Sequence, residues 1–148
     1  MLTTLFHTQA DWAGLILRLV LALVIFPHGA QKVFGWFGGY GYAGTMQFFT
    51  QQIGLPTPVA FLSIMAEFVG PIALVAGLGT RLAALLIAVV MVGAIVKVHR
   101  GTGFFMNWAG KHQAGQEGYE YHLLVIAICA ALIVTGGGAL ALDGLLVR

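Results

Sequence analysis

The chain has 148 residues, of which 59% are hydrophobic and only 8% are charged. Soluble domains carry about 25% charged residues, so this composition excludes an ordinary soluble domain and indicates a one-domain membrane protein, residues 1–148. The net charge of +2 comes without a basic cluster, which excludes nucleic acid as an expected partner. The single cysteine, Cys129, lies in an apolar run, so this chain alone cannot carry out dithiol–disulfide chemistry.

Four stretches are apolar enough to cross a bilayer, which takes about 20 mostly apolar residues. In chain order they are approximately residues 12–34, 58–78, 81–99 and 119–135. Asp11 is the expected N-cap of the first helix, and the turn at Gly79 and Thr80 is so short that the second and third helices must be antiparallel. We therefore predict an all-α integral membrane four-helix bundle with up-down-up-down order.

This order places the two long connections, after the first span and after the third span, on one face of the membrane. Both connections are rich in glycine and aromatic residues. Aromatic side chains favour the headgroup level, so an ordinary aromatic belt is one interpretation. The alternative, which we favour because the aromatics are so one-sided, is a formed cap over the bundle. Within the first connection, residues 45–53 could form a short interfacial helix.

Charged side chains inside the predicted spans are the strongest functional signal. Each costs about 2.5–3.5 kcal/mol at the centre of a membrane helix, so it is expected to face a partner or water. Arg18, His28 and Lys32 fall within one arc of the first helix. Glu67 lies near the middle of the second span and shares a face with Gly70, and small residues favour contacts between membrane helices. We predict that Glu67 faces the bundle interior and pairs, directly or through water, with Arg18 or His28.

The positions of these residues along the helices also suggest that they lie near one another. Counted from the face with the long connections, His28 and Glu67 lie at a similar level, and Arg18 lies deeper. We therefore predict a polar pocket with His28 and Lys32 at its mouth and with Glu67 and Arg18 at its floor.

Four more ionisable residues lie near that face. Helical phase predicts that Lys97 and Glu120 point inward, next to small residues on their own helices. His99 and His122 each lie two positions from these residues, so we expect them to point roughly the opposite way.

Structural interpretations remain open for each of these residues. Lys32 and Lys97 could extend to the lipid headgroups, Arg18 and Glu67 could form a structural ion pair, and His28 could simply end a helix. The histidines and carboxylates show no metal-binding spacing such as His-Glu-x-x-His, so no metal site is expected.

The order of the motifs resembles a known family. In sequence order the chain contains "LRLVLALVIFPHGAQKVFGWFGG", "PVAFLSIMAEFVGPIALVAGLGTRLAAL", "GTGFF" and "GYEYHLLVIAI". This pattern resembles the DoxX family of small four-span bacterial membrane proteins over nearly the whole chain. Its most specific elements are Arg18, Gly29-Ala30-Gln31-Lys32, Glu67 with Gly70 and Gly77, Thr80-Arg81, Phe104-Phe105 and Glu117-Gly118-Tyr119-Glu120. The resemblance implies a multi-pass protein of the bacterial inner (plasma) membrane. It also implies a redox role, because the family includes a membrane subunit of a thiosulfate:quinone oxidoreductase.

These observations lead to the hypothesis of a membrane subunit of a quinone-linked oxidoreductase. Glu67 and His28 would hydrogen-bond the quinone oxygens and supply protons, and Arg18 would hold Glu67 ionised. The further residues expected to bind the cofactor are Lys32, Lys97 and Glu120, with Trp36, Phe104 and Phe105 as walls. No recognisable motif encodes a cofactor, and the chain has no redox-active cysteine pair, so redox chemistry would need a quinone, another cofactor or a partner redox protein.

Two other classes of function stay open. The chain could be a non-enzymatic membrane scaffold or assembly partner for a redox or stress-response complex, with a pocket that only binds lipid. It could instead be a pathway for a small solute or for protons, with Glu67 as the relay. The lipid bilayer is the expected surrounding in every case, and homo-oligomerisation is left open.

Overall fold

The computed structural model describes residues 6–108, 110 and 117–146, and all regular structure in them is helical. The long helices are α2 (Trp12–Phe34), α4 (Thr57–Ala76), α5 (Thr80–Ala94) and α6 (Glu120–Thr135). The short ones are η1 (Trp36–Gly38), α3 (Gly41–Gln47), η2 (Phe48–Gln52), η3 (Ile95–His99) and η4 (Leu142–Leu145). The predicted all-α class is confirmed.

Three helical segments of the described chain have the length and apolar composition to cross a membrane: Trp12–Phe34, Thr57–Ala76 and Thr80–His99. The third of these joins α5 to the π-helical turn η3. α6 is apolar but has only 16 residues. At 1.5 Å per residue it is about 24 Å long, less than the roughly 30 Å hydrocarbon core of a bilayer. The crossing by the fourth predicted span therefore stays a prediction.

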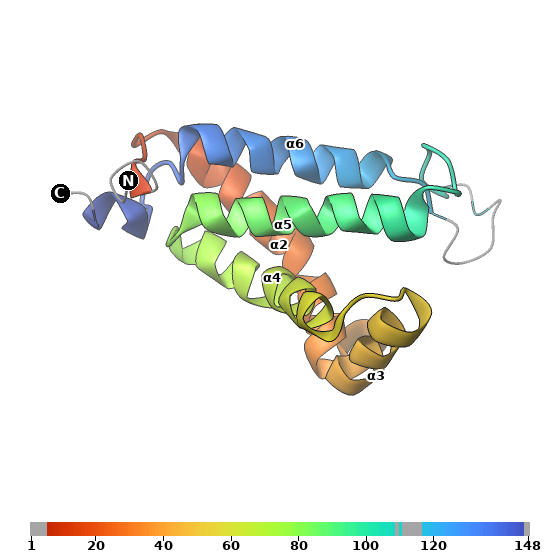
Figure 1. Cartoon of the computed structure of the whole chain (residues 1–148). Coiled ribbons are helices and arrows are strands. Elements are labelled where there is room, and N and C mark those ends of the chain that lie inside the picture. Colours follow the sequence, from red (N-terminus) through yellow and green to blue (C-terminus); the bar gives the residue numbers. More distant parts are fainter. Residues whose placement is uncertain (1–5, 109, 111–116, 147–148) are drawn as a thin grey trace.

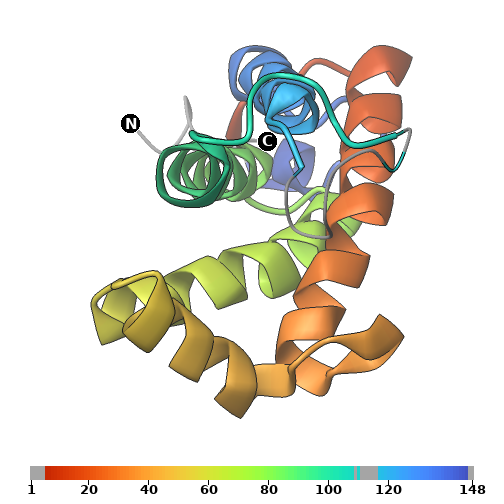
Figure 2. The ribbon, with the colours of Figure 1, turned by 90° about the vertical axis from the view of Figure 1, so that its right-hand side faces the viewer.

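The helices pack mainly as two pairs, α2 with α4 and α5 with α6, and α4 also packs against α5 (Figure 1). α4 and α5 are close at their shared turn and diverge toward the opposite end (Figures 1 and 2). Both long connections lie at that opposite end, as predicted from the up-down order. The described parts of the two connections lie on opposite sides of this end and do not close over it as the favoured cap would require (Figure 2).

Local signals explain the limits of α2. The side chain of Asp11 accepts a hydrogen bond from the backbone nitrogen of Gly14 at 2.7 Å, so the predicted N-cap is confirmed. The helix ends at Gly35, which has a φ of 74°. This left-handed conformation is accessible to glycine at little cost, and it lets the Gly35 nitrogen donate to the Gln31 carbonyl oxygen at 3.2 Å.

Arg18 is buried at the end of the molecule where α4 and α5 meet, and only 1% of it is exposed. Its guanidinium donates to the carbonyl oxygens of four residues: Leu74 at 2.8 Å, Val75 at 2.6 Å, Gly137 at 2.9 Å and Ala139 at 3.0 Å. Leu74 and Val75 lie in the last turn of α4, where carbonyl groups lack a partner within the helix and a cation is favoured. Arg18 therefore joins α2, the end of α4 and the segment that follows α6.

Asp143 completes the same end of the fold. Its carboxylate accepts hydrogen bonds from the backbone nitrogens of Gly79 at 2.6 Å and Thr80 at 2.9 Å, so a residue distant in sequence caps the start of α5. Its own nitrogen donates to the Gly77 carbonyl oxygen at 2.9 Å. This arrangement fixes the α4–α5 turn against the C-terminal segment.

Gly29 sets the contact between α2 and α4. A Cβ atom placed on Gly29 would lie 2.6 Å from the Glu67 carbonyl carbon and 2.7 Å from the Phe68 Cα, closer than real Cβ atoms come to backbone. Small residues permit such close approach of membrane helices. The absence of a side chain at Gly29 therefore brings α2 directly against the backbone of Glu67.

We expect Arg18→Lys to lower the free energy of unfolding by about 2–4 kcal/mol, because one ammonium group cannot replace all four hydrogen bonds and each unsatisfied carbonyl costs about 1–3 kcal/mol. Thermal unfolding in detergent would measure this loss. Arg81→Lys is the control, since within the described chain Arg81 donates from one nitrogen, Nη2, to the exposed carbonyl groups of His7 and Val134. An equal effect of the two substitutions would contradict the structural role of Arg18.

We expect Gly29→Ala to destabilise the protein by about 1–3 kcal/mol, because the added methyl group must push α4 away from α2. Gly93→Ala is the control, since a Cβ at Gly93 meets no atom within 4 Å. The comparison uses thermal unfolding of both variants in the same detergent. If Gly29→Ala melts at or above the temperature of Gly93→Ala, the helices do not depend on this contact.

Candidate functional site

A cavity of about 450 Å³ lies among the helices toward the end that carries the long connections. Its apolar walls include Ile25, Phe49, Ile53, Leu55, Val59, Val89, Val90 and Met91. Its polar residues are His28, Lys32, Ser63, Glu67, Lys97, His99, Glu117, Tyr121 and His122. The cavity thus contains the predicted His28, Lys32 and Glu67, but Arg18 is not part of its lining.

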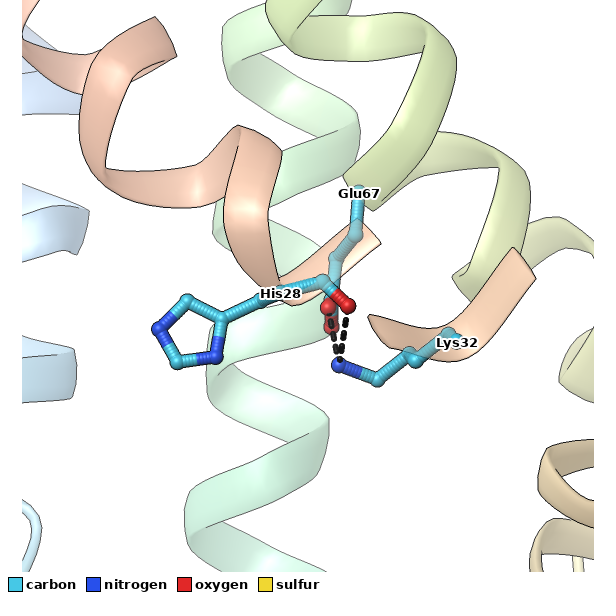
Figure 3. Close-up of polar contacts among 3 residues, drawn as sticks. All are labelled: His28, Lys32 and Glu67. Carbon is cyan, nitrogen blue, oxygen red and sulfur yellow. Dashed lines mark hydrogen bonds and ion pairs between the residues drawn. The ribbon is translucent and has the colours of Figure 1, made fainter. Parts of the chain in front are cut away.

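Lys32 and Glu67 form the central ion pair of the cavity. The Lys32 Nζ contacts the Glu67 carboxylate and also lies 3.5 Å from the carbonyl oxygen of His28 (Figure 3). The side chain of Glu67 is 6% exposed and that of Lys32 is 21% exposed. Because the bilayer makes an unpaired charge costly, this pair explains how α4 can carry a carboxylate near its centre.

The structure corrects the predicted partner of Glu67. Glu67 faces the interior, as expected, but its direct partner is Lys32, and the side chains of Arg18 and His28 do not contact it. A guanidinium carries all five of its donor hydrogens on one planar group. The guanidinium of Arg18 donates to four carbonyl oxygens at the end of α2 far from Lys32. Arg18 therefore neither forms the floor of the pocket nor contacts Glu67.

His28 lies in the same cavity but does not join the ion pair through its side chain. Its imidazole points away from Lys32 and Glu67 (Figure 3). The ring lies beside that of Tyr121 on α6, with 6.3 Å between the ring centroids. His28, Lys32 and Glu67 thus share one cavity, and among these three residues only Lys32 and Glu67 are in direct side-chain contact.

A row of rings continues from His28 along the wall of the cavity. The centroid distance is 5.6 Å from Tyr121 to His122 and 4.4 Å from His122 to His99. The Nδ1 atom of His99 lies 2.7 Å from the carbonyl oxygen of Glu117. His122 is only 8% exposed. The prediction that His99 and His122 point away from the interior is therefore wrong.

Two features of the backbone explain that error. Residues 95–99 form a π-helical turn, in which hydrogen bonds join residues five apart, so the side-chain directions shift from those of a regular α-helix. This shift lets both Lys97 and His99 line the cavity. In α6 every face is apolar, so small residues are a poor guide to the buried side. The buried positions are His122, Val125, Cys129 and Leu132.

Glu120 stabilises a connection and does not line the cavity. Its carboxylate accepts hydrogen bonds from the Met106 nitrogen at 2.8 Å and the Trp108 Nε1 at 2.9 Å. Glu117 accepts a hydrogen bond from the Asn107 nitrogen at 2.9 Å. The two carboxylates therefore hold the segment after Phe105, and the predicted inward direction of Glu120 is wrong.

The predicted aromatic walls are also elsewhere. Trp36 packs on Phe34 with 5.1 Å between ring centroids, and Phe104 packs on Phe105 at 5.2 Å. All of these rings are exposed, Phe105 by 75%, and none lines the cavity. The aromatic residues of the cavity are Phe49 in η2 and Tyr121 in α6. Exposed rings at one end of the helices fit the aromatic-belt interpretation.

Sequence reasoning missed the pairing of His99 with His122. The available signal was their position, because they lie at the two ends of the connection between the third and fourth predicted spans. When a connection joins two antiparallel helices, the residues at its two ends lie at the same height along the helices. Among the described residues, no group of three or more histidine, cysteine, aspartate or glutamate side chains could hold a metal ion.

Comparison with known proteins agrees with this architecture. The DoxX family profile matches residues 13–100, which include Arg18, His28, Lys32 and Glu67. The chain is 34% identical over 129 residues to the Bacillus subtilis (strain 168) protein named "Putative oxidoreductase CatD", and this alignment covers 87% of the chain and 83% of that protein. No solved structure matches significantly. The family match covers more than half of the chain, and three of the described helical segments are long and apolar enough to cross a membrane. The chain therefore belongs to the DoxX family of membrane proteins.

Proposed function

We propose that this chain is the membrane subunit of a quinone-linked oxidoreductase of the bacterial inner membrane. The observation that carries the proposal is the cavity itself, in which aliphatic walls surround a buried Lys32–Glu67 ion pair. A relative at 34% identity whose name describes an oxidoreductase supports a redox role for the chain.

The cavity residues fit a quinone headgroup. Small-molecule sites commonly measure about 300–1,000 Å³ and combine apolar walls with a few polar groups, and this cavity falls within that range. An ammonium group has three hydrogens, and the Lys32 Nζ uses two of them, one toward Glu67 and one toward the His28 carbonyl oxygen, which leaves the third for a ligand oxygen. The exposed aliphatic side chains of Val59 and Val89 line the cavity and provide an apolar surface for an isoprenoid tail.

In this proposal, this chain binds the quinone and handles protons, and a partner protein supplies the electrons. A bound quinone supplies an acceptor for two electrons and two protons. The residues of this chain bind the ring, exclude water and hold protons at the Lys32 ammonium and the His28 imidazole. The electrons come from a partner redox protein, since Cys129 is the single cysteine of the chain and no dithiol pair is present.

Quinone content tests the proposal directly. We expect protein purified in mild detergent to retain a quinone, detected by solvent extraction and mass spectrometry. Lys32→Met should lower the amount retained per protein by about tenfold, since a charge-assisted hydrogen bond contributes about 1.5–3 kcal/mol. Arg100→Met is the control, because Arg100 is exposed and lies outside the cavity.

Three results would contradict the proposal or redirect it. Wild-type protein that carries phospholipid, retains no quinone and does not bind added quinone would favour the scaffold function. Proton flux through the purified protein in liposomes, abolished by Glu67→Gln and without quinone binding, would favour the proton pathway. Equal quinone content in Lys32→Met and Arg100→Met would show that the Lys32–Glu67 ion pair does not contribute to quinone binding.

A further inference from the structure

A second polar group in the cavity is not used by the ion pair. Tyr121 and His122 lie at the start of α6, and both line the cavity. The Tyr121 hydroxyl oxygen and the His122 Nδ1 are buried and have no hydrogen-bond partner within the described chain. Buried polar atoms in native proteins are nearly always hydrogen-bonded, so two exceptions on adjacent residues that line one cavity indicate a missing partner.

His99 fixes the orientation of this group. A carbonyl oxygen can only accept a hydrogen bond, so the contact of the His99 Nδ1 with the Glu117 carbonyl requires the hydrogen on Nδ1. In the neutral ring the Nε2 is then an acceptor. The His99 ring packs against His122 with 4.4 Å between centroids. His99 is therefore a positioning residue that restrains the His122 ring from the side of the second long connection.

The two polar groups lie at different places on the cavity wall. Lys32 and Glu67 come from α2 and α4, whereas His122 comes from α6. The row of rings from His28 through Tyr121 to His122 joins them. The cavity lining also includes aliphatic side chains such as Ile25 and Met91. A ligand that satisfies both groups needs two separated oxygen atoms on an apolar body.

We propose that Tyr121 and His122 form the second contact point for the cavity ligand, and that the ligand is a ring with two separated carbonyl oxygens. Lys32 donates to one oxygen. The His122 Nδ1 and the Tyr121 hydroxyl bind the other. This assignment rests on the proposed function and narrows it, because an isoprenoid alcohol or a fatty acid has only one polar end and would leave one of the two groups without a partner.

The test uses a decyl-tailed benzoquinone with ¹³C-labelled carbonyl carbons, bound to the full chain in lipid nanodiscs. Equilibrium dialysis gives the dissociation constant, and isotope-edited infrared spectra give the two carbonyl frequencies. In the wild-type protein we expect both carbonyl bands to lie below the free frequency. His122→Phe should weaken binding about tenfold, the change that the loss of 1.4 kcal/mol produces, and should return one band to the free frequency. Lys32→Met should release the other band.

Three further variants separate contact from structure. His122→Asn keeps a polar nitrogen near the Nδ1 position, so we expect it to bind about as tightly as the wild type. Tyr121→Phe removes only the hydroxyl group and should shift the same carbonyl band as His122→Phe. His7→Phe is the matched control, because His7 is exposed and does not line the cavity. Thermal unfolding of each variant reports on folding, and Tyr121→Phe and His122→Asn decide the question if His122→Phe does not fold.

The outcomes distinguish this inference from the proposed function. If the wild-type protein does not bind the quinone, the proposed function itself fails. If Lys32→Met weakens binding while His122→Phe and Tyr121→Phe bind like His7→Phe, the second contact point is wrong and the proposed function stands. The assignment to the His122 Nδ1 is overturned if His122→Asn loses as much affinity as His122→Phe. It is also overturned if His122→Phe and Tyr121→Phe release the same carbonyl band as Lys32→Met.

Discussion

The buried guanidinium of Arg18 is the interaction on which the rest of the structure depends. A buried charged group in a membrane helix needs hydrogen-bond partners from the protein, because a bilayer offers no water to supply them. Arg18 meets this requirement by binding the last turn of α4 and the segment after α6 at the same time. Asp143 fixes the start of α5 beside it. One end of the helices is thereby closed by hydrogen bonds, and the other end is left for α4 and α5 to diverge (Figure 1).

The charged residues of the spans therefore divide into two groups with different roles. Arg18 acts through backbone oxygens and holds the helices together, whereas Lys32 and Glu67 bind each other inside a cavity. Gly29 connects the two roles, because its contact with the Glu67 backbone sets the distance between α2 and α4. The ion pair is thus a consequence of helix packing, and it remains accessible from the cavity because Lys32 is only partly buried.

Apart from Glu117, the polar groups of the cavity come from helices, and the long connections contribute mainly apolar walls such as Phe49 and Ile53. Helices hold side chains more rigidly than loops do, which favours precise hydrogen bonding to a ligand. Glu117 and Glu120 fit this division, since their carboxylates hold the backbone and the Trp108 ring of the second connection. The carboxylates of Glu117 and Glu120 thus stabilise the rim of the cavity, whereas Lys32, Tyr121 and His122 are the residues proposed to contact a ligand.

The amino-acid sequence by itself determined the all-α class, the Asp11 cap, the position of both long connections at one end and the presence of His28, Lys32 and Glu67 in one cavity. These features follow from apolar length, capping chemistry and the cost of charge in a membrane, which are local properties of the chain. The tertiary structure decided that Lys32, not Arg18, pairs with Glu67, and that His99 and His122 line the cavity. Sequence could not supply this, because partners depend on distances between helices, which Gly29 sets, and because side-chain directions depend on helical phase. The π-turn at residues 95–99 shifts that phase, and the uniformly apolar surface of α6 leaves it unmarked.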